Sequence, residues 1–409
     1  METKESIRYN LQHLNQIVFE VTDECNLSCK YCSYSSMYEG YDTRSRTKMQ
    51  FDIPKTIIDH VIKIRDSSPN TNYPLTISFY GGEPLLNFSL IRKVVEYIKN
   101  TYSSKKINYG MTTNAMLLHK YMDYLKSNNF QLTISLDGGE KAQGYRVDHK
   151  GSNSFMKVFK NVHLLKLQYP EYFESNVNFN SVMHNLNSAE SAFRFIKQNF
   201  NKKTTLSALS ASGIKKEKME EFKKMYQNVS DSILSSNNID DLETDMFIKS
   251  PRVLDLVYYI VKYSQNFFKD YNDLIYDLSF KNKRRTGTCS PFSKKMFITV
   301  NGKILQCERI GHQFAMGQVT GKNIQLNPEE IANSQNKFIN KLREQCNKCS
   351  LKKICPQCIY RISNITEKNP ICNQFANKKE FEKLIETTTN FLSEHPSYYE
   401  RILNEVKID

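Results

Sequence analysis

The sequence lacks an apolar run long enough to cross a membrane. Its most apolar stretch, VLDLVYYIVKY from Val253, is interrupted by Asp255 and Lys262, and the amino-terminal stretch METKESIRYNLQHLNQ is polar. A membrane-spanning helix needs about 20 apolar residues, and an export signal places an apolar segment behind a basic start. We therefore expect a soluble, cytoplasmic protein with no membrane partner.

Cysteine is absent between Cys32 and Cys289, although the chain has ten cysteines. Three of them precede this gap and seven follow it. In a chain without an export signal, clustered cysteines indicate metal ligation rather than a disulfide framework. The gap itself predicts two separate metal-bearing regions.

Acidic residues are outnumbered by basic ones: the chain has 43 Asp and Glu and 57 Lys and Arg, which gives a formal net charge of +14. A basic balance is typical of proteins that bind a polyanion, either nucleic acid or an acidic peptide. Lysines that coat solvated faces produce the same balance. Only the run KNKRR at 281–285 is dense in charge, and we interpret it as a linker. A nucleic-acid partner is therefore not favoured.

Short apolar runs alternate with helix-like segments over residues 16–210. The runs begin at Gln16, Leu75, Lys106, Phe130, Asn176 and Thr204. Ser89 and Ser188 stand where helix N-caps are expected. Six strand–helix repeats predict an α/β fold with a parallel sheet, a partial (β/α)6 barrel similar to a TIM barrel. In such barrels the active site lies at the carboxyl ends of the strands.

The 409 residues suggest about two to three domains. We predict the barrel over 1–214, a helical bridge over 215–286, a cysteine-rich domain over 287–375 and a carboxyl-terminal helix within 376–409.

The stretch TDECNLSCKYC places Cys25, Cys29 and Cys32 after the first predicted strand and supplies no fourth cysteine. Structural metal sites usually have four protein ligands, so three leave one coordination position open. From the residues alone, a zinc knuckle or three unrelated buried thiols are the alternatives.

With Tyr31 directly before Cys32, this spacing resembles the radical S-adenosylmethionine (SAM) superfamily. The resemblance implies a 4Fe–4S cluster in which Cys25, Cys29 and Cys32 hold three irons. The fourth iron then binds the amino and carboxylate groups of SAM. Reductive cleavage of SAM yields a 5′-deoxyadenosyl radical, and the electron donor is a protein such as flavodoxin or ferredoxin.

Two further segments carry the resemblance. YGGEP ends the second strand, and its Gly81, Gly82 and Glu83 match the family segment that receives the SAM amino group. Glycine allows close approach of the backbone to a ligand. SLDGGEKAQGYR follows the fourth strand, and by resemblance its Ser135 and Arg146 hold the SAM carboxylate. Arginine suits this task because its fork can bind a carboxylate with two hydrogen bonds.

Other positions are less specific. The chain has KAQGYR where the family usually shows a His–Asp pair before this arginine. Asn114 and Asn180 are candidates for nucleoside contacts, or else simply polar residues at strand ends.

The carboxyl-terminal cysteines resemble the SPASM domain, which holds two auxiliary 4Fe–4S clusters. By resemblance, one cluster has four ligands: Cys346, Cys349, Cys355 and Cys372. The other has three ligands, Cys289, Cys307 and Cys358, and an open iron. From spacing alone, a zinc ribbon built from the two C-x2-C pairs at 346–349 and 355–358 is the alternative.

Glu308 directly follows Cys307, where a carboxylate could accept a proton from a substrate. The alternative is a solvated surface residue, and His312 is a secondary candidate.

Together these features predict a radical SAM/SPASM peptide or protein maturase. The expected reaction installs a thioether, carbon–carbon or carbon–oxygen crosslink in a ribosomally synthesised precursor peptide. One alternative is an anaerobic sulfatase-maturating enzyme that forms formylglycine, a family that normally has one more cysteine between the positions of Cys289 and Cys307. A basic zinc-ribbon protein that binds nucleic acid is the alternative of another class.

Overall fold

The computed structural model describes residues 1–69, 73–237, 239–247, 250–260 and 286–406. The run 281–285, interpreted above as a linker, lies outside these ranges. Contacts divide the chain into two compact units. The barrel unit comprises Glu2–Ser232 and Ser290–Ala332, and the cysteine-rich unit comprises Met1, Ile233–Cys289 and Asn333–Asp409.

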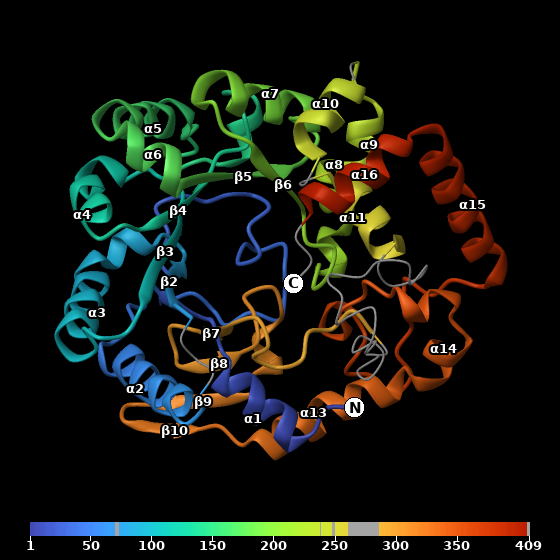
Figure 1. The fold of residues 1–409 in the computed structure, drawn as a ribbon. Coiled ribbons are helices and arrows are strands. Elements are labelled where there is room, and N and C mark those ends of the chain that lie inside the picture. Colours follow the sequence, from blue (N-terminus) through green and yellow to red (C-terminus); the bar gives the residue numbers. More distant parts are fainter. Residues whose placement is uncertain (70–72, 238, 248–249, 261–285, 407–409) are drawn as a thin grey trace. The chain divides into compact units, whose positions relative to one another are not determined.

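Six parallel strands follow one another in chain order across the sheet of the barrel unit (Figure 1). They are β1 (Gln16–Thr22), β2 (Leu75–Gly81), β3 (Ile107–Thr113), β4 (Gln131–Ser135), β5 (Val177–Met183) and β6 (Thr204–Ala208). Each begins at or next to the residue predicted from the apolar runs. The α/β fold with a parallel sheet is therefore confirmed.

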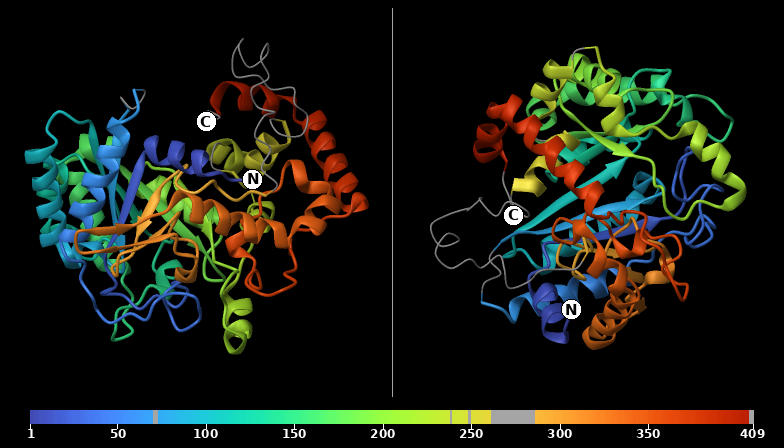
Figure 2. Two further views of the ribbon diagram at one scale, coloured as in Figure 1. Left: turned by 90° about the horizontal axis from the view of Figure 1, so that it is seen from below. Right: turned by 90° about the vertical axis from the view of Figure 1, so that its right-hand side faces the viewer.

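Helices cover the outer side of these strands (Figures 1 and 2). The α-helices before β7 are α1 (Lys4–Gln12), α2 (Asp52–Asp66), α3 (Phe88–Thr101), α4 (Met122–Ser127), α5 (Phe155–Gln168), α6 (Pro170–Asn176), α7 (Ala189–Phe200), α8 (Met219–Met225), α9 (Val229–Leu234), α10 (Ile239–Met246) and α11 (Pro251–Tyr258). Later in the chain are α13 (Pro328–Lys341), α14 (Arg343–Lys348), α15 (Lys378–Glu394) and α16 (Pro396–Glu405). No helix within the described ranges is long and apolar enough to cross a membrane.

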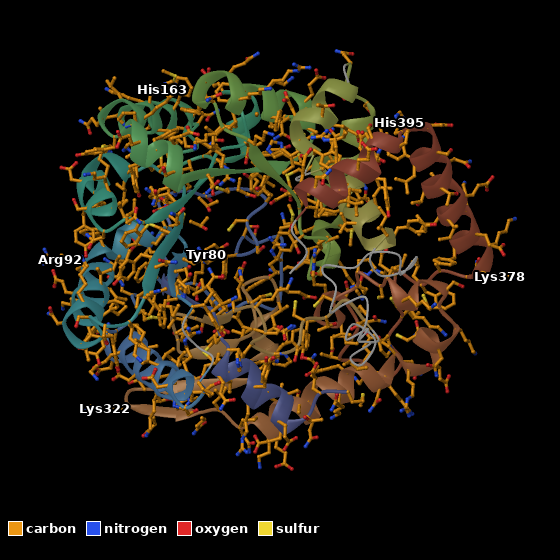
Figure 3. All side chains as sticks on the ribbon, viewed as in Figure 1. Tyr80, Arg92, His163, Lys322, Lys378 and His395 are labelled. Carbon is orange, nitrogen blue, oxygen red and sulfur yellow. The ribbon has the colours of Figure 1, made fainter. Side chains whose placement is uncertain are left out.

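The alternation of side chains along β1 separates the core from the interior of the barrel. Ile17, Phe19 and Val21 belong to the apolar core beneath the helices. Residues of the opposite parity, including Glu20, point to the inner side. Glu20 pairs in register with Tyr80 of β2, so both side chains lie on this inner face. Figure 3 shows Tyr80 inside the ring of strands.

Residues 290–332 extend the barrel sheet instead of belonging to the predicted cysteine-rich domain. β7 (Met296–Ile298) pairs parallel with β1, and β8 (Lys303–Leu305), β9 (Gly317–Thr320) and β10 (Asn323–Gln325) continue antiparallel from it. The compact units therefore depart from the predicted boundary at 287, because these backbone hydrogen bonds attach the segment to β1.

The two predicted helix caps had different outcomes. Ser188 caps α7 and forms a capping box with Ser191, as the sequence predicts. Ser89 is wrong as a cap, because α3 begins at Phe88 with Asn87 in the cap position. The preceding turn of 3₁₀ helix, Pro84–Asn87, runs directly into α3 and leaves no room for a separate cap.

The described part of the cysteine-rich unit has a helical apolar core of its own. Val253 and Leu256 of α11 cluster with Phe247 and with Ile402 of α16. α15 contacts α16, and Figure 2 shows both helices in red. The predicted carboxyl-terminal helix is confirmed by α15, whereas α16 was not foreseen as a separate helix.

Candidate functional site

A loop that follows β1 carries Cys25, Cys29 and Cys32 as half-buried free thiols. Burial raises the pKa of Cys25 to about 11 and that of Cys29 to about 12, and the neighbouring thiols contribute to both shifts. The three thiols therefore lie within electrostatic reach of one another. Within the described ranges, no three His, Cys, Asp or Glu side chains converge as ligands of one metal ion. A 4Fe–4S cluster needs no such convergence, because each thiolate binds a different iron.

Gly81 and Gly82 bring the end of β2 against this cysteine loop. The Gly82 amide donates to the carbonyl oxygen of Thr22 at 2.9 Å, and the Glu83 amide donates to that of Glu24 at 2.9 Å. A Cβ on Gly82 would lie 2.0 Å from the Glu24 oxygen. Gly81 has a φ of +136°, and a Cβ there would lie 2.2 Å from the Thr22 oxygen. Only glycine fits at both positions, and the donor set and backbone cradle suit the implied cluster and its SAM ligand.

The carboxylate of Glu83 braces the ends of β2 and β3. It is fully buried and accepts hydrogen bonds from the Leu85 amide at 3.1 Å, the Thr113 hydroxyl at 2.7 Å and the Asn114 amide at 2.8 Å. Burial raises the pKa of Glu83 to about 7, although these hydrogen bonds oppose the shift. The Asn114 side chain in turn lies 3.8 Å from the Cys25 sulfur. Glu83 thus acts on the cysteine loop through the strand ends.

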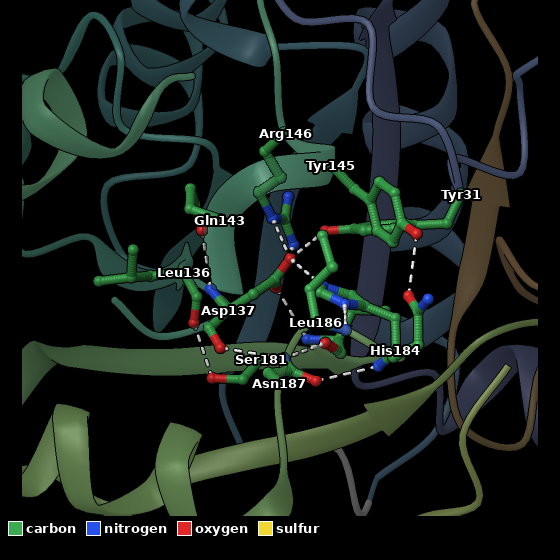
Figure 4. Close-up of polar contacts among 12 residues, drawn as sticks. Tyr31, Leu136, Asp137, Gln143, Tyr145, Arg146, Ser181, His184, Leu186 and Asn187 are labelled. Atoms are coloured by element: carbon green, nitrogen blue, oxygen red, sulfur yellow. Dashed lines mark hydrogen bonds and ion pairs between the residues drawn. The ribbon is translucent and has the colours of Figure 1, made fainter. Parts of the chain in front are cut away.

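A buried ion pair anchors the other side of the loop (Figure 4). Arg146 donates two hydrogen bonds to the carboxylate of Asp137, which lies just after β4, from Nε at 2.9 Å and from Nη2 at 3.0 Å. The same carboxylate accepts hydrogen bonds from the Val182 amide at 2.9 Å and from the Tyr31 hydroxyl. The ring of His184 stacks on Tyr31 with centroids 5.5 Å apart. Burial alone would raise the pKa of Asp137, but the Arg146 charge and the hydrogen bonds hold it at about 2. Tyr31 therefore ties the cysteine loop to the ends of β4 and β5.

This geometry bears on the two residues predicted to hold the SAM carboxylate. Nε and Nη2 of Arg146 already donate hydrogen bonds to Asp137, so binding of the SAM carboxylate by Arg146 stays a prediction. Ser135 is the last residue of β4 and lies half-buried opposite Asn180 of β5. Sequence reasoning missed Asp137 and His184. Their positions just past strand ends were the available signal.

Glu308 lies in the barrel unit shortly after β8. Its side chain is 18% exposed, and Oε1 lies 3.2 Å from the Lys295 amine. Burial raises the pKa of Tyr80 above its ordinary value, and the neighbouring Glu308 and Cys32 raise it further. Glu308 and Cys32 are thus both within electrostatic reach of a side chain on the inner face. A fully solvated Glu308 does not fit this arrangement.

Six of the seven later cysteines lie in the cysteine-rich unit, and Cys307 lies in the barrel unit. Burial raises the pKa of Cys372, and the nearby Cys355 and Cys349 thiols add to the effect. Burial also raises the pKa of Cys358, and the neighbour that adds to it is Cys289. These side chains therefore fall into two groups, one around Cys372 and one joining Cys358 to Cys289.

Residues 19–196 match the family model of the Radical SAM superfamily. The chain therefore carries a radical SAM domain, as the cysteine spacing and the glycine motif predicted.

The relatives point to enzymes of this superfamily. The radical SAM cyclopropyl synthase TigE of Paramaledivibacter caminithermalis is 31% identical over 179 residues, which cover 42% of this chain and 36% of TigE. The cysteine-type anaerobic sulfatase-maturating enzyme of Clostridium novyi is 27% identical over 194 residues, covering 46% of this chain and 49% of that enzyme. The matches thus span less than half the length of these curated relatives.

A solved structure, native anSMEcpe with bound AdoMet, resembles the whole fold with a TM-score of 0.64. The alignment covers 96% of this chain and 100% of that chain at 17% sequence identity. At this identity the likeness shows the fold alone.

Replacing Gly82 with alanine should disrupt the cluster site. Its Cβ would collide with the Glu24 carbonyl oxygen at 2.0 Å and displace the cysteine loop. Gly139→Ala is the matched control, since its nearest contact would be an ordinary 3.6 Å. We expect Gly82→Ala to lose about four irons and four sulfides per chain after anaerobic reconstitution, and the control to retain them. Full iron content with an unchanged SAM dissociation constant in Gly82→Ala would contradict this account.

Ser135→Ala and Arg146→Ala should separate SAM binding from folding. Ser135→Ala should weaken SAM binding while cluster content and melting temperature stay unchanged. Arg146→Ala should also lower the free energy of unfolding by about 3–5 kcal/mol, because it leaves the buried Asp137 carboxylate without its cation. Calorimetric SAM titration and thermal unfolding check both variants. A normal SAM dissociation constant in both would remove these residues from the SAM site.

Proposed function

We propose that this radical SAM enzyme modifies a peptide or protein by installing a thioether, carbon–carbon or carbon–oxygen link in a ribosomally synthesised precursor. The observation that carries the proposal is the position of Glu308. The carboxylate of Glu308, next to the predicted ligand Cys307, is only 18% exposed and lies within electrostatic reach of Tyr80 on the inner face of the barrel. Closing a new bond on a substrate radical also releases a proton and one electron. A carboxylate there can accept the proton, and an auxiliary cluster of the kind proposed below would accept the electron.

Each group of residues in this chain would have its own role in the proposed reaction. A cluster held by Cys25, Cys29 and Cys32 supplies the electron that cleaves SAM to methionine and a 5′-deoxyadenosyl radical. Gly82 lets the end of β2 pack directly against the Glu24–Cys25 peptide, and Tyr31 fixes the loop against Asp137. Glu308 accepts the substrate proton, oriented by its ion pair with Lys295.

We further propose two auxiliary 4Fe–4S clusters of the SPASM type. One would be held by four cysteines: Cys346, Cys349, Cys355 and Cys372. The nearness of Cys349, Cys355 and Cys372 and the separate association of Cys358 with Cys289 support this partition over a zinc ribbon. Cys307 would complete the second set by resemblance. A flavodoxin or ferredoxin would supply the electrons.

Formylglycine formation on a sulfatase is the second candidate. The sequence match to the Clostridium novyi enzyme favours it. The absence of a further cysteine between Cys289 and Cys307 counts against it. TigE, a cyclopropyl synthase by name, supports carbon–carbon bond formation instead.

Reconstituted enzyme should contain about twelve irons and twelve sulfides per chain, and the triple variant C25A/C29A/C32A should lose about four of each. With SAM and dithionite, wild type should form 5′-deoxyadenosine and the triple variant should not.

Small peptides encoded beside the gene and a sulfatase-derived cysteine peptide serve as substrates, and mass spectrometry measures the modification of each peptide. A crosslink without an aldehyde supports the proposal, whereas hydrazide-reactive formylglycine would establish the second candidate. 5′-Deoxyadenosine formation by the triple variant would refute the cluster assignment.

Glu308→Gln should uncouple SAM cleavage from product formation. The amide keeps the shape of the side chain but cannot accept the proton, and loss of a general base typically slows reaction by about 10²–10⁴-fold. We expect 5′-deoxyadenosine to form with all clusters present, while modified peptide falls by that factor. Glu329→Gln is the control, because this carboxylate is 63% exposed. Product within a few-fold of wild type in Glu308→Gln would exclude the base role.

A further inference from the structure

Arg44 lies in the loop that follows the cysteine motif, and two nitrogen atoms of its guanidinium group have no hydrogen-bond partner. Its guanidinium carbon sits 3.6 Å from the centroid of the Tyr34 ring, so the aromatic ring covers one face of the group. Nε and Nη2 are both buried and have no hydrogen-bond partner. These are the same two atoms with which Arg146 grips Asp137. The barrel unit thus holds one arginine fork filled by a carboxylate and a second one without a carboxylate.

The platform beneath Arg44 is fixed in place. Tyr34 packs against Tyr41 with ring centroids 5.1 Å apart and against His312 at 6.1 Å. His312 is only 4% exposed, and its Nδ1 accepts a hydrogen bond from the Asp42 amide at 3.1 Å. The Asp42 carboxylate accepts a hydrogen bond from the Lys303 amine of β8 at 2.6 Å. His312, the secondary catalytic candidate from the sequence, is therefore a buried anchor of this loop. The face of the Arg44 guanidinium is held by Tyr34, while its Nε and Nη2 atoms stay without a hydrogen-bond partner.

A second unpartnered group lies within electrostatic reach. Glu20 is 1% exposed on the inner face of β1, and its Oε2 accepts from the Val300 amide at 2.9 Å. Its Oε1 and the Tyr34 hydroxyl are buried without a hydrogen bond of ordinary geometry, although the Tyr34 hydroxyl lies close enough to the Glu20 carboxylate to lower its pKa. Burial raises the pKa of Glu20 to about 7, and the Arg44 charge opposes that shift. The Arg44 charge also lowers the pKa of Cys25, so it lies within electrostatic reach of both Glu20 and the cysteine loop.

Burying polar groups without hydrogen bonds is costly, so this group of atoms needs a ligand. A planar carboxylate matches the Nε–Nη2 edge of a guanidinium with two parallel hydrogen bonds. Glu20 does not fill that role, because within the described residues Nε and Nη2 of Arg44 and Oε1 of Glu20 have no hydrogen-bond partner. A ligand that brings a carboxylate would satisfy Arg44, and a donor group on the same ligand would satisfy Oε1 of Glu20.

We propose that Arg44, stacked on Tyr34 beside Glu20, is the receptor for a ligand carboxylate at the mouth of the barrel. Two molecules can supply this group: SAM itself, whose predicted partner Arg146 is occupied by Asp137, or an acidic residue or carboxyl terminus of the peptide substrate. The peptide source rests on the proposed function, whereas the SAM source rests only on the radical SAM domain.

The first experiment measures the dissociation constants of SAM and of decarboxylated SAM on fully reconstituted wild type, Arg44→Gln and Arg44→Lys. Arg46→Gln is the matched control, because Arg46 is an exposed arginine of the same loop. If SAM is the source, Arg44→Gln should weaken SAM by about tenfold to a hundredfold and leave decarboxylated SAM unchanged. Arg44→Lys keeps the charge without the fork and should show an intermediate loss.

If SAM affinity is unchanged, the second experiment uses SAM-loaded enzyme and two capped probes, N-acetyl-glutamate methylamide and N-acetyl-glutamine methylamide. Wild type and Arg46→Gln should bind the glutamate probe more tightly, and Arg44→Gln should lose that preference. Unchanged SAM affinity together with no Arg44-dependent preference for glutamate overturns the proposal. Iron content and 5′-deoxyadenosine formation in the same samples report on the proposed function independently, and normal values show that the variants fold.

Discussion

The contact between the end of β2 and the cysteine loop is the constraint on which the rest of the site depends. At Gly82 the backbone approaches the Glu24–Cys25 peptide so closely that no side chain fits between them. Two backbone hydrogen bonds close this contact, and the buried Glu83 carboxylate extends it to the end of β3. Because the loop itself has little regular structure, its thiols depend on these neighbours for their positions. The glycines therefore set the shape of the metal site as much as the cysteines do.

Two arginines show how the same side chain can serve structure or recognition. Arg146 has its fork filled by Asp137, and the pair fixes Tyr31 and with it the far side of the cysteine loop. Arg44 has its face filled by Tyr34 and its edge unfilled. An arginine that is satisfied within the protein holds the fold, while one that is stacked but unpaired is prepared for a partner from outside. The arrangement places both cations beside the cysteine loop.

The strands and the cysteine motif could be predicted because their signals are local. Alternating apolar residues mark β1 to β6, and the C-x3-C-x2-C spacing occupies only eight residues, from Cys25 to Cys32. β7 could not be predicted as part of the barrel, because a three-residue apolar run does not reveal its partner 279 residues earlier. The grip of Arg146 on Asp137 was missed for a related reason. The sequence shows both residues, but only the folded turn after β4 decides which carboxylate the arginine reaches.

The attachment of β7 has a consequence for how this chain can be divided. In the sheet order, β7 lies beside the free side of β1 and completes its hydrogen bonding. The superfamily match over 19–196 ends long before β7 begins. A fragment cut at the end of the matched region would expose β1 as an edge strand, with unpaired N–H and C=O groups able to join another chain. The radical SAM domain recognised in the sequence is thus not a self-sufficient folding unit, and aggregation of such a fragment would reflect a missing strand rather than a missing cluster.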